Sequence, residues 1–181
     1  MIAPRKKLPI GIQSFAKLRN EGCYYVDKTE FALRLIEQGG DFFLSRPRRF
    51  GKSLLLDTLR CLFEGRGALF EGLYIHDKWD WTTQYPVVNI SFSNGVVTSR
   101  EDLDANIRFQ LQQQRQRLGI DSATPERIAD DFASLIENAH RAHGQRVIVL
   151  IDEYDKPILD NLLNAELARE LREGLKNLYS V

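Results

Sequence analysis

Gly51, Lys52 and Ser53 stand in a row directly after an arginine-rich segment and directly before an apolar one. A lysine can reach the β and γ phosphates of a nucleotide as a point charge, and a serine hydroxyl can take a place on Mg²⁺. A glycine allows the backbone to come close to phosphate oxygens. Because three such residues recur by chance in many sequences, the triplet alone is weak evidence for a phosphate-binding loop, and a position between a strand and a helix would strengthen it.

The acidic pair Asp152 and Glu153 is a second candidate group, and it follows the five apolar residues 147–151. This pattern is typical of a strand that delivers acidic side chains to the edge of a sheet. We expect Asp152 to hold the shell of Mg²⁺, usually through water, and Glu153 to polarise the attacking water beside the γ-phosphate. The alternative is that both carboxylates cap the next helix or pair with the arginines of the loop. Taken with Lys52 and Ser53, the pair favours the metal site, because carboxylates at a buried strand end are costly without a cation.

Alternating helices and strands are needed to bring both groups to one edge of a sheet. The spacing of apolar residues predicts helices over 14–19, 29–40, 52–65, 99–118, 124–139 and 167–179, and strands over 41–45, 86–93 and 147–151. Strands separated by helices indicate an α/β fold with a parallel sheet covered on both faces. The free amides and positive end of the helix that begins at Lys52 would then lie where an anion fits.

Capping signals mark several of these helix ends. Thr29 is expected to cap the second helix, which two glycines end at 39 and 40. Ser99 and Asp102 have the spacing of a capping box. Thr124 is expected to cap the helix that Pro125 begins.

The glutamine-rich stretch 110–117 is interpreted as the solvent-facing side of a helix. The buried stripe of that helix is predicted to be Leu103, Ile107, Leu111 and Leu118. The inward face of the next helix is predicted to be Ile128, Phe132, Leu135, Ile136 and Ala139.

The composition limits the classes of function. Lysine plus arginine and aspartate plus glutamate both number 25, so no excess of positive charge indicates nucleic acid or a membrane surface as a partner. Nucleic acid stays possible only as a local contact. Cys23 and Cys61 lack a metal-ligand spacing and are interpreted as free thiols in a reducing compartment. The chain has no long apolar run and no signal-peptide core, which leads us to expect a cytoplasmic protein without a membrane partner.

Three motifs closely resemble the predicted AAA-ATPase-like family of bacterial and archaeal P-loop proteins. They are "YYVDKT" at 24–29, "RPRRFGKS" at 46–53 and "IDEYDKP" at 151–157, and the resemblance covers nearly the whole chain. It implies a three-layer α/β P-loop NTPase fold of the additional-strand (ASCE) type, with ATP and Mg²⁺ as ligands. Members often carry a C-terminal nuclease-like domain of the PD-(D/E)XK type, an effector that would here be supplied elsewhere.

The resemblance implies a role for each matching residue. Glu153 and Lys52 are the candidate catalytic residues, and Ser53 and Asp152 are the candidate metal ligands. The candidate nucleotide-binding residues are Arg48, Arg49, Phe50, Gly51, Lys52, Ser53 and Leu54.

The loop departs from the general P-loop pattern at Arg46, where that pattern has glycine, and at Pro47. Proline removes one amide donor and fixes its own backbone angle, so the general loop geometry is not assumed. The family shares this form, which indicates a variant loop. Arg48 and Arg49 either supply charge to the triphosphate or form a solvated turn with nearby acids, and the sequence leaves both readings open.

The chain ends after the helix that would precede a fourth strand in an additional-strand sheet. We therefore expect a helical N-terminal segment over 1–40 and a partial P-loop domain over 41–181, truncated before that strand. Hydrolysis is expected to be weak in this chain alone. The oligomeric state is not predicted.

The leading hypothesis is an ATP-binding domain that hydrolyses the β,γ bond by Mg²⁺-assisted attack of water. The alternative is a nucleotide-sensing module without useful turnover, which acts through a partner or nucleic acid. Four further features each have a structural and a functional interpretation. Asp155 is either the cap of a helix or a metal ligand, and His140 with His143 is either an ordinary helix end or a pair of metal ligands. Asp27 with Lys28 forms either a turn or part of a site around the nucleotide base, and Trp79 with Trp81 belongs either to the core or to a surface that stacks on bases.

Overall fold

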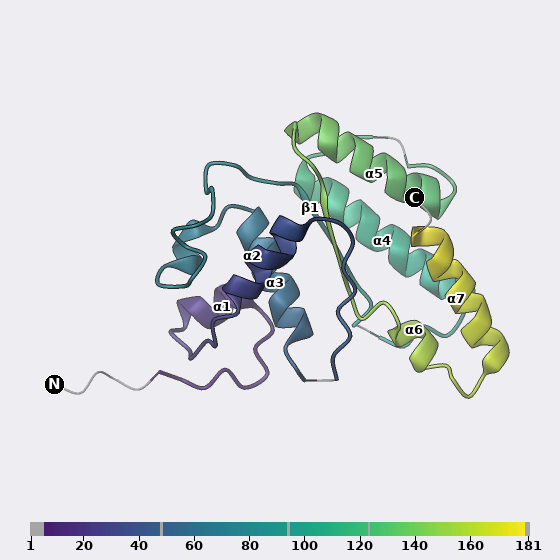
Figure 1. The fold of residues 1–181 in the computed structure, drawn as a ribbon. Helices are drawn as coiled ribbons and strands as arrows, with labels where there is room; N and C mark the ends of the chain where they lie inside the picture. Colours follow the sequence, from purple (N-terminus) through teal and green to yellow (C-terminus); the bar gives the residue numbers. More distant parts are fainter. Residues whose placement is uncertain (1–5, 48, 94, 123, 180–181) are drawn as a thin grey trace. The chain divides into compact units, whose positions relative to one another are not determined.

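The structure is a computed structural model that describes residues 6–47, 49–93, 95–122 and 124–179 (Figure 1). The chain separates into two compact units, Met1–Gln84 and Tyr85–Val181. Each unit has a hydrophobic cluster made of its own residues. No helix of the described residues is long and apolar enough to cross a membrane.

The first unit is helical. It contains α1 (Phe15–Asn20), α2 (Thr29–Gln38), α3 (Lys52–Phe63) and the short 3-10 helix η1 (Gly67–Phe70). Its core is formed by Phe15, Cys61, Leu62, Phe70 and Ile75. The Phe15 and Phe70 rings lie 4.8 Å apart, so aromatic packing joins the start of α1 to η1. The predicted helices of this part of the chain are confirmed.

The start of α2 differs from the prediction. Thr29 is the first helical residue, and Lys28 occupies the N-cap position without a side-chain hydrogen bond. The acceptor comes instead from Asp27, whose carboxylate takes hydrogen bonds from the backbone N–H of Thr29 at 2.9 Å and from its hydroxyl at 2.7 Å. The expectation that Thr29 is the cap is therefore wrong, because a preceding aspartate satisfies the helix start better. The predicted end at Gly39 is confirmed, since this residue has a φ of 63°.

The strand predicted over 41–45 is wrong: these residues belong to no strand. Phe42, Phe43 and Leu44 are 51%, 70% and 42% exposed. An apolar run becomes a strand only when a neighbouring backbone pairs with it, and no strand among the described residues does so here. The strand half of the predicted strand-loop-helix is thus absent, while the helix half is present as α3.

The second unit is built around a parallel pair of strands, which confirms the predicted α/β class and parallel sheet. β1 (Val87–Ser91) pairs with β2 (Ile148–Asp152) in a register that places Ser91 opposite Asp152. Four helices complete the unit: α4 (Arg100–Leu118), α5 (Ile128–His143), α6 (Lys156–Leu159) and α7 (Ala165–Tyr179).

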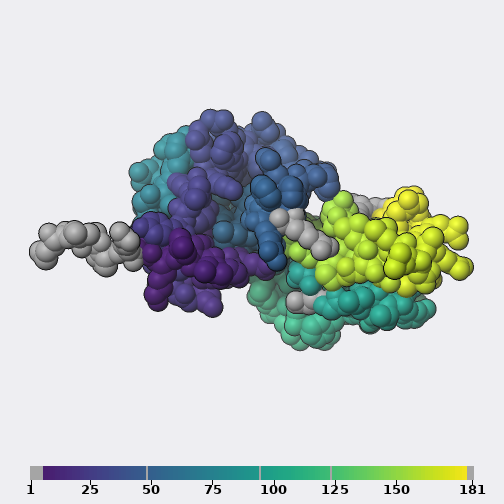
Figure 2. All heavy atoms as spheres, turned by 90° about the horizontal axis from the view of Figure 1, so that it is seen from below, coloured from purple at the N-terminus to yellow at the C-terminus, as the bar shows by residue number. Residues whose placement is uncertain are grey.

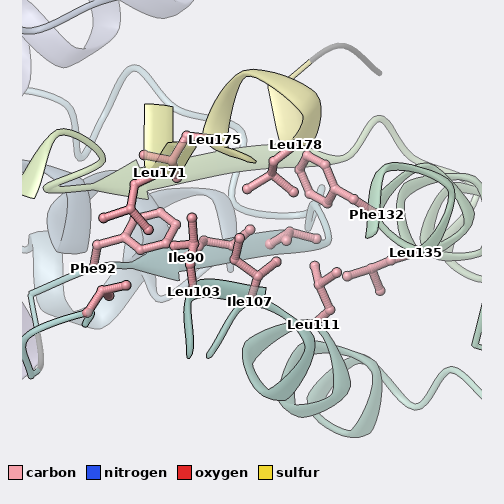
Figure 3. Packing of buried hydrophobic residues seen from close by; sticks show 12 residues of the cluster. Ile90, Phe92, Leu103, Ile107, Leu111, Phe132, Leu135, Leu171, Leu175 and Leu178 are labelled. Carbon is pink, nitrogen blue, oxygen red and sulfur yellow. The ribbon is translucent and has the colours of Figure 1, made fainter. Parts of the chain in front are cut away.

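Apolar side chains from β1, α4, α5 and α7 converge in the core of the second unit (Figure 3). The residues that point toward one another are Ile90, Leu103, Ile107, Leu111, Phe132, Leu135, Leu171, Leu175 and Leu178. The predicted stripes of both long helices are confirmed, with Leu118, Ile128 and Ile136 partly buried against this cluster. This burial fixes which ends of β1 and β2 carry polar residues.

The two long helices begin differently. The Ser99 hydroxyl accepts the backbone N–H of Asp102 at 3.1 Å, which confirms the predicted cap of α4. The start of α5 at Thr124 and Pro125 is wrong, because the helix begins only at Ile128. The guanidinium of Arg108 accounts for the delay, since it donates to the carbonyls of Pro125 and Glu126 and holds this segment outside the helix.

A buried ion pair joins α4 to α5. An Arg115 guanidinium nitrogen lies 2.5 Å from an Asp131 carboxylate oxygen, and the side chains are only 6% and 1% exposed. Arg115 also donates to the Asp131 carbonyl at 3.0 Å and to the Ser122 hydroxyl at 3.3 Å. Each charge has lost its water, so each depends on the other for compensation.

We predict that Asp131→Ala lowers the free energy of unfolding by about 3–5 kcal/mol, because the Arg115 charge is left buried without its partner. Urea denaturation followed by circular dichroism measures this. The control is Asp130→Ala, whose exposed pair with Arg127 at 3.8 Å is expected to contribute less than about 1 kcal/mol. Equal effects of the two substitutions would show that burial of the pair is unimportant.

Candidate functional site

The turn before α3 is shaped by Gly51. This residue is the N-cap of α3 and has a φ of 78°, in the left-handed region that a residue with a Cβ rarely adopts. Its carbonyl accepts the backbone N–H of Leu55 at 2.9 Å, the first turn of the helix. The backbone N–H groups of the residues between them have no acceptor within the helix, so they are available to an anion.

The ammonium of Lys52 lies back over the loop that precedes it. Its Nζ donates to the carbonyl of Arg46 at 2.8 Å and to the carbonyl of Pro47 at 3.3 Å. The side chain therefore links the start of α3 to the loop before it, and its ammonium is solvent-exposed. A phosphate that entered the loop would meet this charge together with the free amides of the first turn of α3.

The other predicted residues of the loop have distinct positions. Arg49 has a φ of 68°, which is strained for a residue with a side chain. Phe50 is 63% exposed, and Ser53 is half-buried in the first turn of α3. The Leu54 side chain packs against the core of the first unit, which leaves its backbone N–H as the group that could contact a ligand. Arg48 lies outside the described residues.

The acidic pair ends β2 as the sequence predicts. The Asp152 carbonyl accepts the backbone N–H of Phe92 at 3.0 Å, which continues the pairing with β1 by one step. Glu153 then has a φ of 51°, and its carbonyl accepts the N–H of Lys156 at 3.0 Å. The chain therefore turns sharply at Glu153, at a cost of about 1–2 kcal/mol for the left-handed conformation.

Hydroxyl groups lie beside this acidic end. Ser91 is opposite Asp152 in the parallel register, so both side chains lie on the same face of the sheet. The Ser91 and Ser93 hydroxyl oxygens are 2.8 Å apart. The sequence analysis missed these serines, although polar residues at the end of an apolar strand were the available signal.

Two polar residues after β2 hold the loop that follows β1. Lys156 donates from Nζ to the Gly95 carbonyl at 2.6 Å and to Asp160 at 2.7 Å. The Asn161 amide donates to the Val97 carbonyl at 2.8 Å. In the space-filling view, residues near 155–165 accordingly lie against residues near 95–105 (Figure 2). The lysine of the "IDEYDKP" motif thus has a structural partner that the sequence did not indicate.

Asp27 of the "YYVDKT" motif is a structural residue of the first unit. Its carboxylate accepts the backbone N–H of Tyr74 at 2.7 Å, in addition to both groups of Thr29. The Thr29 hydroxyl in turn accepts the Ile75 N–H at 3.2 Å. Burial opposes ionisation of Asp27, but the hydrogen bonds from Tyr74 and Thr29 outweigh it and hold its pKa below the usual value. These contacts agree with the interpretation of Asp27 as a turn residue.

The remaining candidates have contacts of their own. His140 Nδ1 lies 2.8 Å from the Gln145 carbonyl, and His143 Nε2 lies 3.2 Å from the Leu118 carbonyl. Among the described residues no group of three or more metal-ligating side chains is found. Asp155 is the N-cap residue of α6, but its side chain makes no capping hydrogen bond.

The tryptophans and cysteines belong to the interior of the first unit. Trp79 packs edge-on against Phe63 at 5.6 Å, and Trp81 packs against Phe70 at 5.1 Å. Cys23 and Cys61 are buried free thiols, as predicted. Burial raises the pKa of Cys61 to about 11, which keeps this thiol protonated and unreactive at neutral pH.

The predicted site residues therefore form two groups. Lys52 and Ser53 belong to the first unit, and Asp152 and Glu153 belong to the second. The geometry of each group is defined within its own unit. A glycine-lysine-serine turn at the start of a helix is one feature of the phosphate-binding loop of P-loop nucleotide-binding proteins.

Comparisons with known proteins agree with this class. The model of the family described as "Predicted AAA-ATPase" matches residues 9–181, and the chain therefore belongs to this family. Family membership suggests an ATP-binding P-loop NTPase. No solved structure matches the chain.

A curated relative extends beyond the matched region. The chain is 60% identical over 178 residues to a protein of Azotobacter chroococcum mcd 1 that is named "Uncharacterized protein in vnfD 5'region". The match covers 98% of this chain and 34% of the relative. The chain thus spans about a third of the length of this relative.

We predict that Asp27→Asn destabilises the first unit at neutral pH and that the difference from wild type shrinks in acid. The folded-state pKa of Asp27 lies below its unfolded value, so its contribution is present above about pH 4 and is lost as the pH falls through the folded pKa. Thermal unfolding between pH 3 and pH 7 measures this. Asp41→Asn, at an exposed position, is the control. A pH-independent difference between wild type and Asp27→Asn would contradict the account.

Proposed function

We propose that this chain binds Mg·ATP and that the bound nucleotide is hydrolysed at the β,γ bond by an activated water. The observation that carries the proposal is the position of the Lys52 ammonium, across the carbonyls of Arg46 and Pro47 at the start of α3. A lysine in this place gives up weak carbonyl contacts for a phosphate, to which its charge binds more strongly. Family membership supports the nucleotide as the ligand.

The phosphates would be held by the first turn of α3. Its free N–H groups and positive dipole end favour negative charge, and the left-handed Gly51 leaves the approach open, with no atom within 4 Å of where a Cβ would be. Pro47 lacks an N–H, so the loop has one donor fewer than a glycine-rich loop. Arg49 is the described arginine whose charge would compensate for this donor.

The residues available to a metal fit Mg²⁺. The Ser53 hydroxyl and the Asp152 carboxylate are oxygen ligands, which this ion prefers, and Mg²⁺ would neutralise the charge that develops on the phosphates. Glu153, held at the sharp turn after β2, would orient and polarise the attacking water.

A nucleotide-sensing module without useful turnover is the second candidate function. The missing amide donor at Pro47 favours it, because a loop with fewer donors stabilises the charge of the transition state less. Such a module would bind Mg·ATP and pass its state to a partner.

Turnover distinguishes the two candidates. We predict that the wild-type chain releases phosphate from ATP slowly and that Glu153→Gln lowers the rate at least about 100-fold while ATP stays bound, because the general base is lost. Single-turnover phosphate release and equilibrium binding measure the two quantities. Glu137→Gln, an exposed glutamate on α5, is the control.

The hydrolase and the sensing module predict different results in these measurements. Equal rates for wild type and Glu153→Gln would exclude Glu153 as the base. Tight binding without any phosphate release by the wild type would establish the sensing module instead.

A further inference from the structure

Side chains contact the outward edge of β1. Pro86 and Phe92 pair toward β2, since the Pro86 carbonyl accepts the Ile148 N–H at 2.9 Å and the Phe92 N–H donates to Asp152 at 3.0 Å. Backbone groups alternate in direction along a strand, so those of Val87, Asn89 and Ser91 face away from β2. A strand edge of this kind is open to pairing with another chain unless something covers it.

Helix α4 supplies the missing partners. The Gln110 side-chain oxygen accepts the Ser91 N–H at 2.8 Å, and the Gln114 side-chain oxygen accepts the Asn89 N–H at 3.3 Å. The Arg117 guanidinium donates to the Val87 carbonyl. These contacts continue the sequence of hydrogen bonds that a neighbouring strand would make.

The side chains that cover the edge also hold one another. Gln110 donates to the Asn106 side-chain oxygen at 2.6 Å, and Arg117 donates to the Gln114 side-chain oxygen at 2.9 Å. Asn106, Gln110, Gln114 and Arg117 are spaced by three or four residues and therefore lie along one face of α4. We call these four residues the α4 ladder. These contacts fix the Gln110 and Gln114 amides with their oxygens toward the strand.

Other glutamines of the same helix do not take part. Gln112, Gln113 and Gln116 are exposed, as the sequence predicted for the whole stretch. The prediction was wrong for Gln110 and Gln114, which face β1. The helix thus carries two kinds of glutamine, and only one kind contacts the sheet.

The opposite edge of the sheet is different. Among the described residues β2 pairs only with β1, and its central residue Val149 is 36% exposed. The N–H and C=O groups of Val149 and Ile151 face away from β1 by the same alternation. Among the described residues the α4 ladder thus covers the β1 edge, and no strand pairs with the β2 edge.

We propose that the α4 ladder closes the β1 edge to strand addition. The partner that the ladder excludes is an extended strand of a second copy of the chain. Side chains serve this purpose because they satisfy the outward N–H groups while offering no continuous backbone to pair with. The proposal does not depend on nucleotide binding.

The test is the double substitution Gln110→Ala with Gln114→Ala. We expect it to uncover the Asn89 and Ser91 amides, to raise their hydrogen-exchange rates about tenfold or more, and to cause concentration-dependent self-association in sedimentation velocity. The matched control is Gln112→Ala with Gln113→Ala, which removes two exposed glutamines from the same helix and is expected to match the wild type in both measurements. Gln110→Glu with Gln114→Glu keeps an acceptor oxygen at each position and is expected to preserve the closed edge.

Three results would overturn the proposal. One is that the Gln110→Ala, Gln114→Ala variant shows the same amide exchange rates and the same sedimentation as the control variant. Another is that the Gln110→Glu, Gln114→Glu variant self-associates as strongly as the Gln110→Ala, Gln114→Ala variant. The third needs no substitution: in the wild type, the Asn89 and Ser91 amides would exchange much faster than those of Val88 and Ile90, which face β2.

Discussion

The left-handed turn at Gly51 is the constraint on which the candidate site depends. It lets α3 begin at Lys52, so that free amides and a lysine charge meet at one point. A residue with a Cβ at this position would strain the turn or shift the helix start. The family to which the chain belongs gives that geometry its expected ligand.

Backbone strain occurs at both groups of candidate residues. Arg49 and Glu153 are the described residues other than glycine with a positive φ, one in the loop before α3 and the other directly after β2. Such conformations persist where the surrounding structure requires them, and they cluster at sites of function. At Glu153 the surroundings are visible: the pairing of Asp152 with Phe92 fixes the strand, and the Lys156 N–H closes the turn by donating to the Glu153 carbonyl.

The sequence predicted the elements whose evidence is local. Apolar runs located β1 and β2, and helical spacing located the buried faces of α4 and α5, because burial leaves a period in the chain. It did not predict features set by distant partners. Residues 41–45 have strand composition, but no strand among the described residues pairs with them. Arg108 delays the start of α5, and Gln110 and Gln114 look like surface residues until β1 is placed beside them. The residue types of the candidate site could be read from the sequence, whereas the position of Ser91 beside Asp152 became known only from the register of β1 and β2.

The central claim, which rests on the proposed function, is that Lys52 contributes to nucleotide binding through phosphate and Asp152 through Mg²⁺. Titration calorimetry of ATP with and without Mg²⁺, on wild type, Lys52→Met and Asp152→Asn, tests it most directly. The account predicts that Lys52→Met weakens binding under both conditions, because the lysine contacts phosphate, and that Asp152→Asn weakens binding only when Mg²⁺ is present. An unchanged Mg·ATP affinity in Asp152→Asn would contradict it.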